Sequence, residues 1–170
     1  SGLISPLMSY WFFMRFGVEV KSLGVLFFAT YIFAALSFLI APIIARRLGV
    51  VRTIASSHGV AALLYLLLPL APSFFIAGLM LVARSFLAYM DTPLRTSFTM
   101  AMVQAGERGS AAGVTNLSRV VPLSVTPTIS AYLMQNFSLA VPMFLGGGLQ
   151  LAHDFIFYFV FRRLKPPEEK

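Results

Sequence analysis

The chain has 170 residues, of which 58% are hydrophobic and only 11% are charged. A soluble domain carries about a quarter charged residues, so this composition excludes an ordinary water-soluble fold and predicts a membrane protein. The chain has no cysteine, which excludes disulfides, thiol catalysis and thiolate metal sites. Basic loops at a membrane surface account for the net charge of +7, so no nucleic-acid partner is expected.

The hydrophobic residues form long runs, and runs of about 20 residues are long enough to cross the lipid bilayer as helices. In chain order, the expected helices are residues 3–16, 22–45, 50–70, 74–90, 110–134 and 139–161. The first run is too short to span, and we expect it to be a truncated helix, the second half of a span. The fourth helix is expected to continue past Pro93 to about residue 103, and Pro122 and Pro127 should bend the fifth.

The basic residues predict how the helices are oriented. Nine of them fall on one side of the membrane: Arg46, Arg47, Arg52, Arg95, Arg108, Arg162, Arg163, Lys165 and Lys170. The other side holds only Arg15 and Lys21. Basic loops stay in the cytoplasm, so the C-terminus of this multi-pass protein is expected there.

We expect residues 1–170 to form a single transmembrane domain, because no linker interrupts the six runs. The runs divide into two triples, residues 3–70 and 74–161, and three crossings reverse the direction of the second triple. The expected fold is therefore an all-α membrane bundle of six helices, built as a 3+3 inverted repeat of the kind that secondary transporters use.

Four parts of the chain resemble the second half of a major facilitator superfamily transporter. Residues 90–95 (Met-Asp-Thr-Pro-Leu-Arg) and 107–114 (Glu-Arg-Gly-Ser-Ala-Ala-Gly-Val) are similar to the tenth helix, the next cytoplasmic loop and the start of the eleventh helix in many prokaryotic members. Arg47, Leu48, Gly49 and Arg52 resemble the family's loop motif Gly-x-x-x-Asp-Arg-x-Gly-Arg. Asp154 and residues 161–169 resemble the closing helix and tail.

The resemblance implies the C-terminal six-helix half of a secondary active transporter, with an N-terminal six-helix half missing as its partner. It implies a prokaryotic inner membrane location, a small-molecule substrate and proton-coupled export. It also implies a cytoplasmic gate loop formed by Arg46, Arg47, Gly49, Arg52 and Arg95. Arg46 and Pro42 replace the acidic residue and the first glycine of the motif, so the family's gating salt bridge is not expected here.

Four ionisable residues are expected at membrane depth: Arg84, Asp91, Arg119 and Asp154. A charge there costs at least about 2.5 kcal/mol, so each should be paired or face a watery cavity, which makes all four candidates for substrate binding or coupling. Asp91 shares a helix face with Arg84 and Arg95, two switchable partners, and is expected to carry the coupling proton. Asp154 is expected at the periphery with a permanent arginine partner. The alternative for each charge is a structural ion pair.

Ser9 and Tyr10 are further substrate candidates, because the resemblance implies that the first helix faces the central cavity. His58 and the pair His153-Asp154 offer no converging ligands, so neither a metal site nor a cofactor is expected. The three glycines at 146–148 are expected to allow close helix packing.

Two alternatives to a transporter remain open. One is a six-span sensor or interaction subunit that transports nothing. The other is an intramembrane enzyme, which would need converging histidine, acidic or serine side chains. Because no such set is found in the sequence, the protein is not expected to be an enzyme.

Overall fold

A computed structural model describes residues 4–161, apart from the side chains of residues 4–6, 98–102, 105, 108, 119, 122, 123 and 161. Within residues 4–161 the chain is helical and contains no strand. The α-helices are α1 (Ile4–Phe16), α2 (Val20–Leu48), α3 (Val50–Leu67), α4 (Phe74–Tyr89), α5 (Asp91–Met102), α6 (Arg108–Asn136) and α7 (Val141–Phe161). Two short 3-10 turns, Leu68–Leu70 and Ala105–Glu107, follow α3 and α5. The all-α prediction is confirmed.

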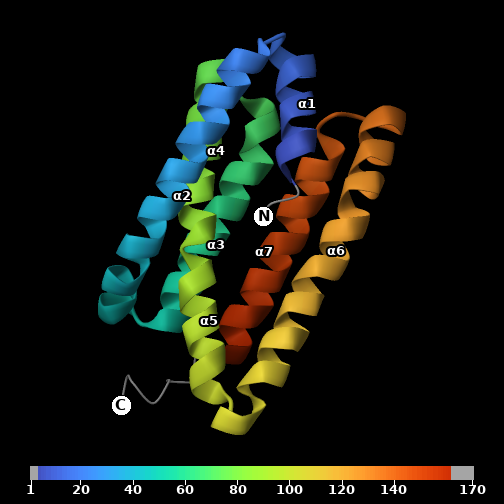
Figure 1. The fold of residues 1–170 in the computed structure, drawn as a ribbon. Coiled ribbons are helices and arrows are strands. Elements are labelled where there is room, and N and C mark those ends of the chain that lie inside the picture. Colours follow the sequence, from blue (N-terminus) through green and yellow to red (C-terminus); the bar gives the residue numbers. More distant parts are fainter. Residues whose placement is uncertain (1–3, 162–170) are drawn as a thin grey trace.

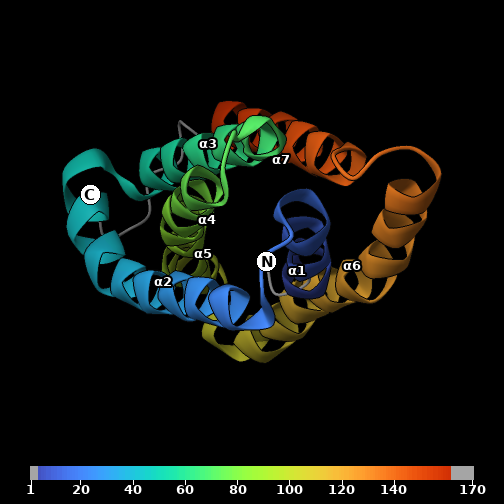
Figure 2. The ribbon, with the colours of Figure 1, turned by 90° about the horizontal axis from the view of Figure 1, so that it is seen from above.

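The helices run along one common axis and form a bundle (Figure 1). Seen along that axis, α2 lies on one side and α3 with α7 on the other, and α4 and α5 lie between them (Figure 2). Helix α3 packs against both α7 and α4, and α2 packs against α4. Helix α6 lies on the side of the bundle opposite to the turn between α2 and α3, with α1 on its inner side (Figure 2).

Four helical segments are long and apolar enough to cross a membrane: Val20–Leu48, Val50–Leu70, Phe74–Ser97 and Val141–Val160. This agrees with the predicted membrane protein. Helix α6 is 29 residues long, but it is rich in serine, threonine and asparagine and is not among the four. Helix α1 has only 13 residues, as its short apolar run predicts. Six crossings and the inverted repeat remain predictions.

The fourth predicted helix is two helices that follow one another along the same path. Helix α4 ends at Tyr89 and α5 begins at Asp91, while Met90 keeps right-handed helical dihedrals. Pro93 has no backbone N–H to donate to the carbonyl of Tyr89, which explains the interruption. The break places Asp91 in the first turn of α5.

Helix α2 illustrates how the bundle sorts its side chains. Its buried residues recur every three or four positions: Leu23, Leu26, Thr30, Ala34, Ser37, Ala41 and Ala45. These side chains are mostly small, so neighbouring helices can approach closely. Large apolar side chains such as Phe28 and Leu39 are exposed on the outer surface. A surface of this kind suits contact with lipid rather than water.

The buried interior consists of two apolar clusters. One gathers around Trp11, Phe12 and Leu81, and the other around Ile54 and Met90. Along the chain, His58 on α3 and Arg84 on α4 come between the residues of these two clusters. This arrangement puts polar and charged groups inside the bundle, where each one needs a partner or a polar cavity.

Candidate functional site

The candidate site is centred on His58, a histidine inside the bundle. It lies eight residues after the start of α3 at Val50, which is about 12 Å along the helix at about 1.5 Å per residue. Its side chain is only 18% exposed. The preceding residue, Ser57, is buried, and its hydroxyl donates to the carbonyl of Ile54 and so needs no other acceptor.

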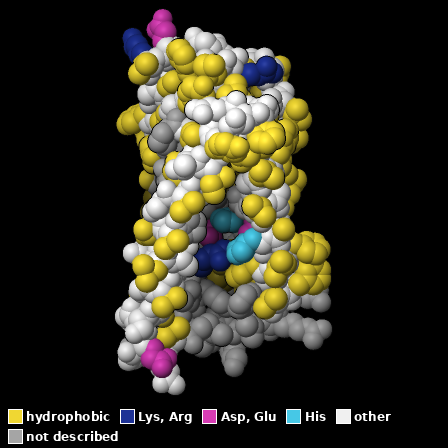
Figure 3. Space-filling view, turned by 90° about the vertical axis from the view of Figure 1, so that its right-hand side faces the viewer, with side chains coloured by type: hydrophobic (Ala, Val, Ile, Leu, Met, Phe, Trp, Pro, Cys, Tyr) yellow, Lys and Arg dark blue, Asp and Glu magenta, His cyan; other side chains and the backbone are white. Residues whose placement is uncertain are grey.

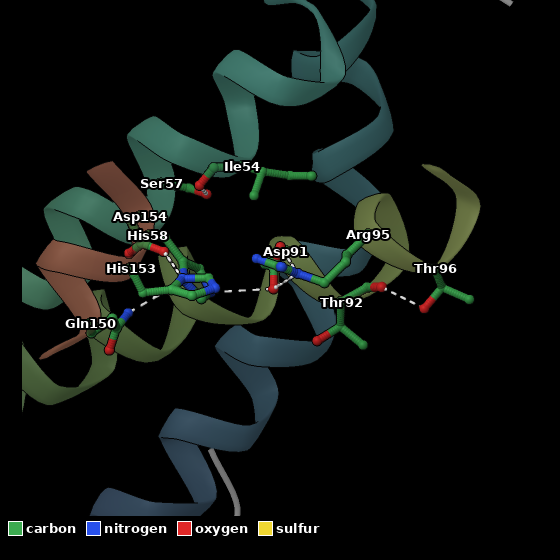
Figure 4. Close-up of polar contacts among 10 residues, drawn as sticks. All are labelled: Ile54, Ser57, His58, Asp91, Thr92, Arg95, Thr96, Gln150, His153 and Asp154. Carbon is green, nitrogen blue, oxygen red and sulfur yellow. Dashed lines mark hydrogen bonds and ion pairs between the residues drawn. The ribbon is translucent and has the colours of Figure 1, made fainter. Parts of the chain in front are cut away.

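His58 contacts a carboxylate from each of two other helices (Figure 4). Its Nε2 lies 3.4 Å from Oδ2 of Asp91 on α5, and its Nδ1 lies 3.3 Å from Oδ1 of Asp154 on α7. Nε2 of Gln150, one turn before Asp154, lies 3.4 Å from the same Nδ1. One imidazole therefore connects three helices.

The number of contacts that His58 can make depends on its protonation state. An imidazolium carries an N–H on both nitrogens and can donate to Asp91 and Asp154 together, whereas a neutral ring keeps only one N–H. The amide N–H of Gln150 can donate to an unprotonated Nδ1. The ring therefore has a hydrogen-bond partner at Nδ1 whether or not that nitrogen carries a proton.

Arg95 holds Asp91 from within α5. Its Nε lies 3.0 Å from both carboxylate oxygens of Asp91, four residues earlier, which is the spacing of side chains on one helix face. The guanidinium also lies over the ring of Phe157 on α7, 4.9 Å from its centre. The carboxylate of Asp91 thus lies between the guanidinium of Arg95 and the imidazole of His58.

Asp154 has different partners from those expected. His153 Nδ1 lies 3.0 Å from Asp154 Oδ1, the oxygen that His58 also contacts. Among the described residues the partners of Asp154 are two histidines, which carry a charge only when protonated, and the expected arginine partner is not among them. The other oxygen of Asp154, Oδ2, is buried and has no hydrogen-bond partner in the part of the chain that the structure describes. Neighbouring positions on a helix usually diverge, yet His153 and Asp154 do meet.

This group of residues is visible from one face of the bundle. Histidine, acidic and basic side chains gather in a hollow there, with hydrophobic side chains above it (Figure 3). The side chain of His153 is 59% exposed, while that of Asp154 is 5% exposed. The site therefore grades from an accessible histidine to a buried carboxylate.

A second polar feature surrounds Arg84 on α4. This residue is only 7% exposed, and its guanidinium lies 4.5 Å from the ring centre of Tyr65 on α3. Among the described residues no carboxylate pairs with Arg84. Of the two arginines expected as partners of Asp91, only Arg95 contacts it there. Arg84 borders a cavity of about 150 Å³ lined by Leu7, Met8, Tyr65, Arg84, Thr126, Ser130, Met134, Pro142, Met143, Gly146 and Gln150.

The other substrate candidates lie in less informative places. On α1 the cavity is lined by Leu7 and Met8, whereas Ser9 is not among its lining residues and Tyr10 is 44% exposed. The side chain of Arg119 lies outside the described residues, although its backbone belongs to α6.

The gate-loop residues lie where α2 turns into α3. Gly49 is the single residue between the two helices, and its φ of +87° favours a glycine there. Arg46, Arg47 and Arg52 are exposed around this turn. Arg95, expected in the same gate, pairs with Asp91 at the His58 site, and its role in a gate stays a prediction.

Sequence reasoning missed His58 and Gln150 as functional residues. Their partners come from helices far apart in the chain, and spacing within one helix does not reveal such a convergence. The sequence does contain one signal for His58. It lies four residues after Ile54 and three before Ala61, so it belongs to the buried face of α3.

The described residues contain no group of three or more histidine, aspartate or glutamate side chains arranged to hold a metal ion. The chemistry that the site can perform with its own groups is proton exchange and ion pairing. Comparison of the chain with known protein families, with curated proteins and with solved structures found no match.

Proposed function

We propose that this chain is the proton-coupled helical bundle of a secondary active transporter, which moves a small solute across a membrane by alternating access. The resemblance to the second half of a major facilitator superfamily protein supports this proposal. The same resemblance implies that a second six-helix bundle is the partner of this one, and it favours export as the direction of transport.

The observation that carries the proposal is the position of His58 between Asp91 and Asp154. Ionisable side chains inside apolar helices are costly, and they mark ion and proton pathways when they occur. Histidine is the side chain that ordinarily changes its charge near neutral pH. A histidine that joins two carboxylates is suited to carrying a coupling proton, because proton loss weakens an ionic link between helices.

The proposed coupling step is a change of partners at Nδ1 of His58. With the proton present, Nδ1 donates to Asp154 and connects α3 ionically to α7. With the proton absent, Nδ1 accepts from Gln150, and Asp154 loses that ionic link. Asp91 keeps Arg95 in both states. Protonation thereby changes how strongly α7 is held to α3, which is the kind of two-state element that alternating access needs.

The test is proton movement in everted membrane vesicles that contain the complete gene product and are energised to an acidic interior. Small amphipathic solutes are added in turn while a pH-sensitive dye reports the gradient. A transported solute should dissipate the gradient at a saturable rate, and His58→Gln should lower that rate at least about tenfold.

His153→Gln is the matched control, because His153 contacts the same carboxylate but is mostly exposed. Its rate should stay within about twofold of wild type. A sensor or interaction subunit would give no saturable solute-dependent signal with any member of the panel, and that result would reject the transporter.

A further inference from the structure

Arg84 is a buried cation for which the described residues supply no counter-charge. The acidic side chains inside the bundle, Asp91 and Asp154, contact Arg95, His58 and His153 instead. Nε of Arg84 is buried and has no hydrogen-bond partner among the described residues. An uncompensated charge at this depth is expensive, so its presence calls for a function or for an anion supplied from outside the chain.

The ring of Tyr65 compensates only part of this cost. A cation over an aromatic face gains about 0.5–2 kcal/mol, which is less than the effective penalty of several kcal/mol for burying an ion. The aromatic ring also accepts no planar pair of hydrogen bonds. The fork of N–H donors on a guanidinium matches a carboxylate or another oxyanion, and Tyr65 leaves that capacity unused.

The cavity beside Arg84 has the size and the lining of a ligand site. Its volume of about 150 Å³ is similar to that of an engineered protein cavity known to hold benzene. Leu7, Met8, Met134 and Met143 provide apolar walls, and Ser130 and Gln150 add polar groups. An apolar cavity with a few polar groups at defined positions is the usual form of a small-molecule site.

We infer that this cavity binds a small amphipathic monoanion, with its carboxylate or similar oxyanion on Arg84 and its apolar body against the methionine and leucine side chains. As a statement about the transported solute, this inference rests on the proposed function. As a statement about binding, it depends only on Arg84 and the cavity.

The experiment is a binding titration of the purified chain in detergent, with benzoate as the probe and benzamide as its neutral isostere. Isothermal titration calorimetry should show benzoate binding at least about tenfold more tightly, because only the anion gains a charge-assisted hydrogen bond. Inorganic phosphate, which lacks an apolar body, should bind more weakly than benzoate.

Arg84→Met is the decisive variant, since methionine retains much of the apolar length and removes the charge. It should lose the preference for benzoate over benzamide while keeping or raising the melting temperature, because an uncompensated buried cation has been removed. Arg15→Met, at an exposed arginine on α1, should bind benzoate as wild type does.

Three outcomes would overturn the inference. Equal affinity for benzoate and benzamide would remove the role of charge. Unchanged binding by Arg84→Met would place the site elsewhere. A markedly lower melting temperature of Arg84→Met would make the guanidinium a structural group held by Tyr65. Binding of benzoate without any transport would reject the proposed function and leave this inference intact. Transport with no preference for anions would support the proposed function and reject this inference.

Discussion

At the scale of single residues, the two nitrogens of His58 have unequal surroundings. Among the described residues, Nε2 contacts the carboxylate of Asp91 alone, and an ionised carboxylate accepts hydrogen bonds but never donates one. Nδ1 faces both an acceptor on Asp154 and an amide donor on Gln150. The proton should therefore stay on Nε2 and come and go at Nδ1.

This asymmetry can be observed directly. Nitrogen-15 NMR of the chain labelled at histidine should show Nε2 of His58 protonated throughout a pH titration, while Nδ1 changes state. His153→Gln serves to assign the two histidine spectra. Loss of the proton from Nε2 first, or a ring that never changes state, would contradict the proposed exchange of partners.

The two carboxylates should respond differently to neutralisation. Asp91→Asn removes the counter-charge of Arg95 as well as a partner of His58, so we expect pH-driven transport to fall at least about tenfold. Asp154→Asn leaves no arginine unpaired among the described residues, so its melting temperature in detergent should stay close to that of wild type while proton coupling is lost. A large loss of stability in Asp154→Asn would show that its role is structural.

Particular residues show how far the sequence predicts this site. Asp91, Arg84 and Asp154 are recognisable because a charge in an apolar run is conspicuous, and the Asp91–Arg95 pair follows from helical spacing. The central position of His58 is not recognisable, because it depends on how α3, α5 and α7 are rotated about their axes. For the same reason the sequence does not reveal that Arg84 lacks a carboxylate partner among the described residues. Asp91 lies two turns further along, on the next helix, and pairs with Arg95.

At the scale of helices, the contact between α3 and α7 positions both Asp154 and Gln150 against His58. Gly147 lies at its closest point: a β-carbon there would come within 2.7 Å of Cγ of Leu66 and 3.4 Å of the carbonyl oxygen of Ala62. The sequence predicts close packing at the three glycines, and the structure confirms it for Gly147 and for Gly146, where a β-carbon would lie 3.3 Å from Cε1 of Tyr65. Gly148 has no atom within 4 Å of such a β-carbon.

This difference gives a matched pair of substitutions. Gly147→Ala should destabilise the chain by about 1–3 kcal/mol through overpacking, even though alanine favours a helix. Gly148→Ala should be neutral or stabilising by up to about 1 kcal/mol, because it gains helix propensity without a clash. Melting temperatures in detergent provide the comparison, and equal stability of the two variants would contradict the close contact.

At the scale of the whole molecule, the basic residues lie unevenly between the two ends of the bundle. The turn between α2 and α3, with Arg46, Arg47 and Arg52, lies at the end opposite to the α6–α7 connection (Figure 1). The first end is expected in the cytoplasm. The helix boundaries follow from hydropathy and proline positions, but neither hydropathy nor the fold identifies which end is cytoplasmic.

Single cysteines in this cysteine-free chain test the orientation. In intact cells, Ser138→Cys at the α6–α7 connection should react with an impermeant thiol reagent. Arg52→Cys should react only after the cells are opened. Labelling of Arg52→Cys from outside would reverse the orientation.

The central claim is that His58 carries the proton that accompanies the solute. The most direct measurement uses proteoliposomes with the complete gene product, a gradient of benzenesulfonate and no imposed pH gradient. Benzenesulfonate stays ionised and carries no proton by itself, so proton movement above the leak of protein-free liposomes must come from the protein. Wild type should move protons when the solute gradient is applied, and His58→Gln should move at least about tenfold fewer while still binding the anion. Proton movement by His58→Gln at the rate of wild type would contradict the account.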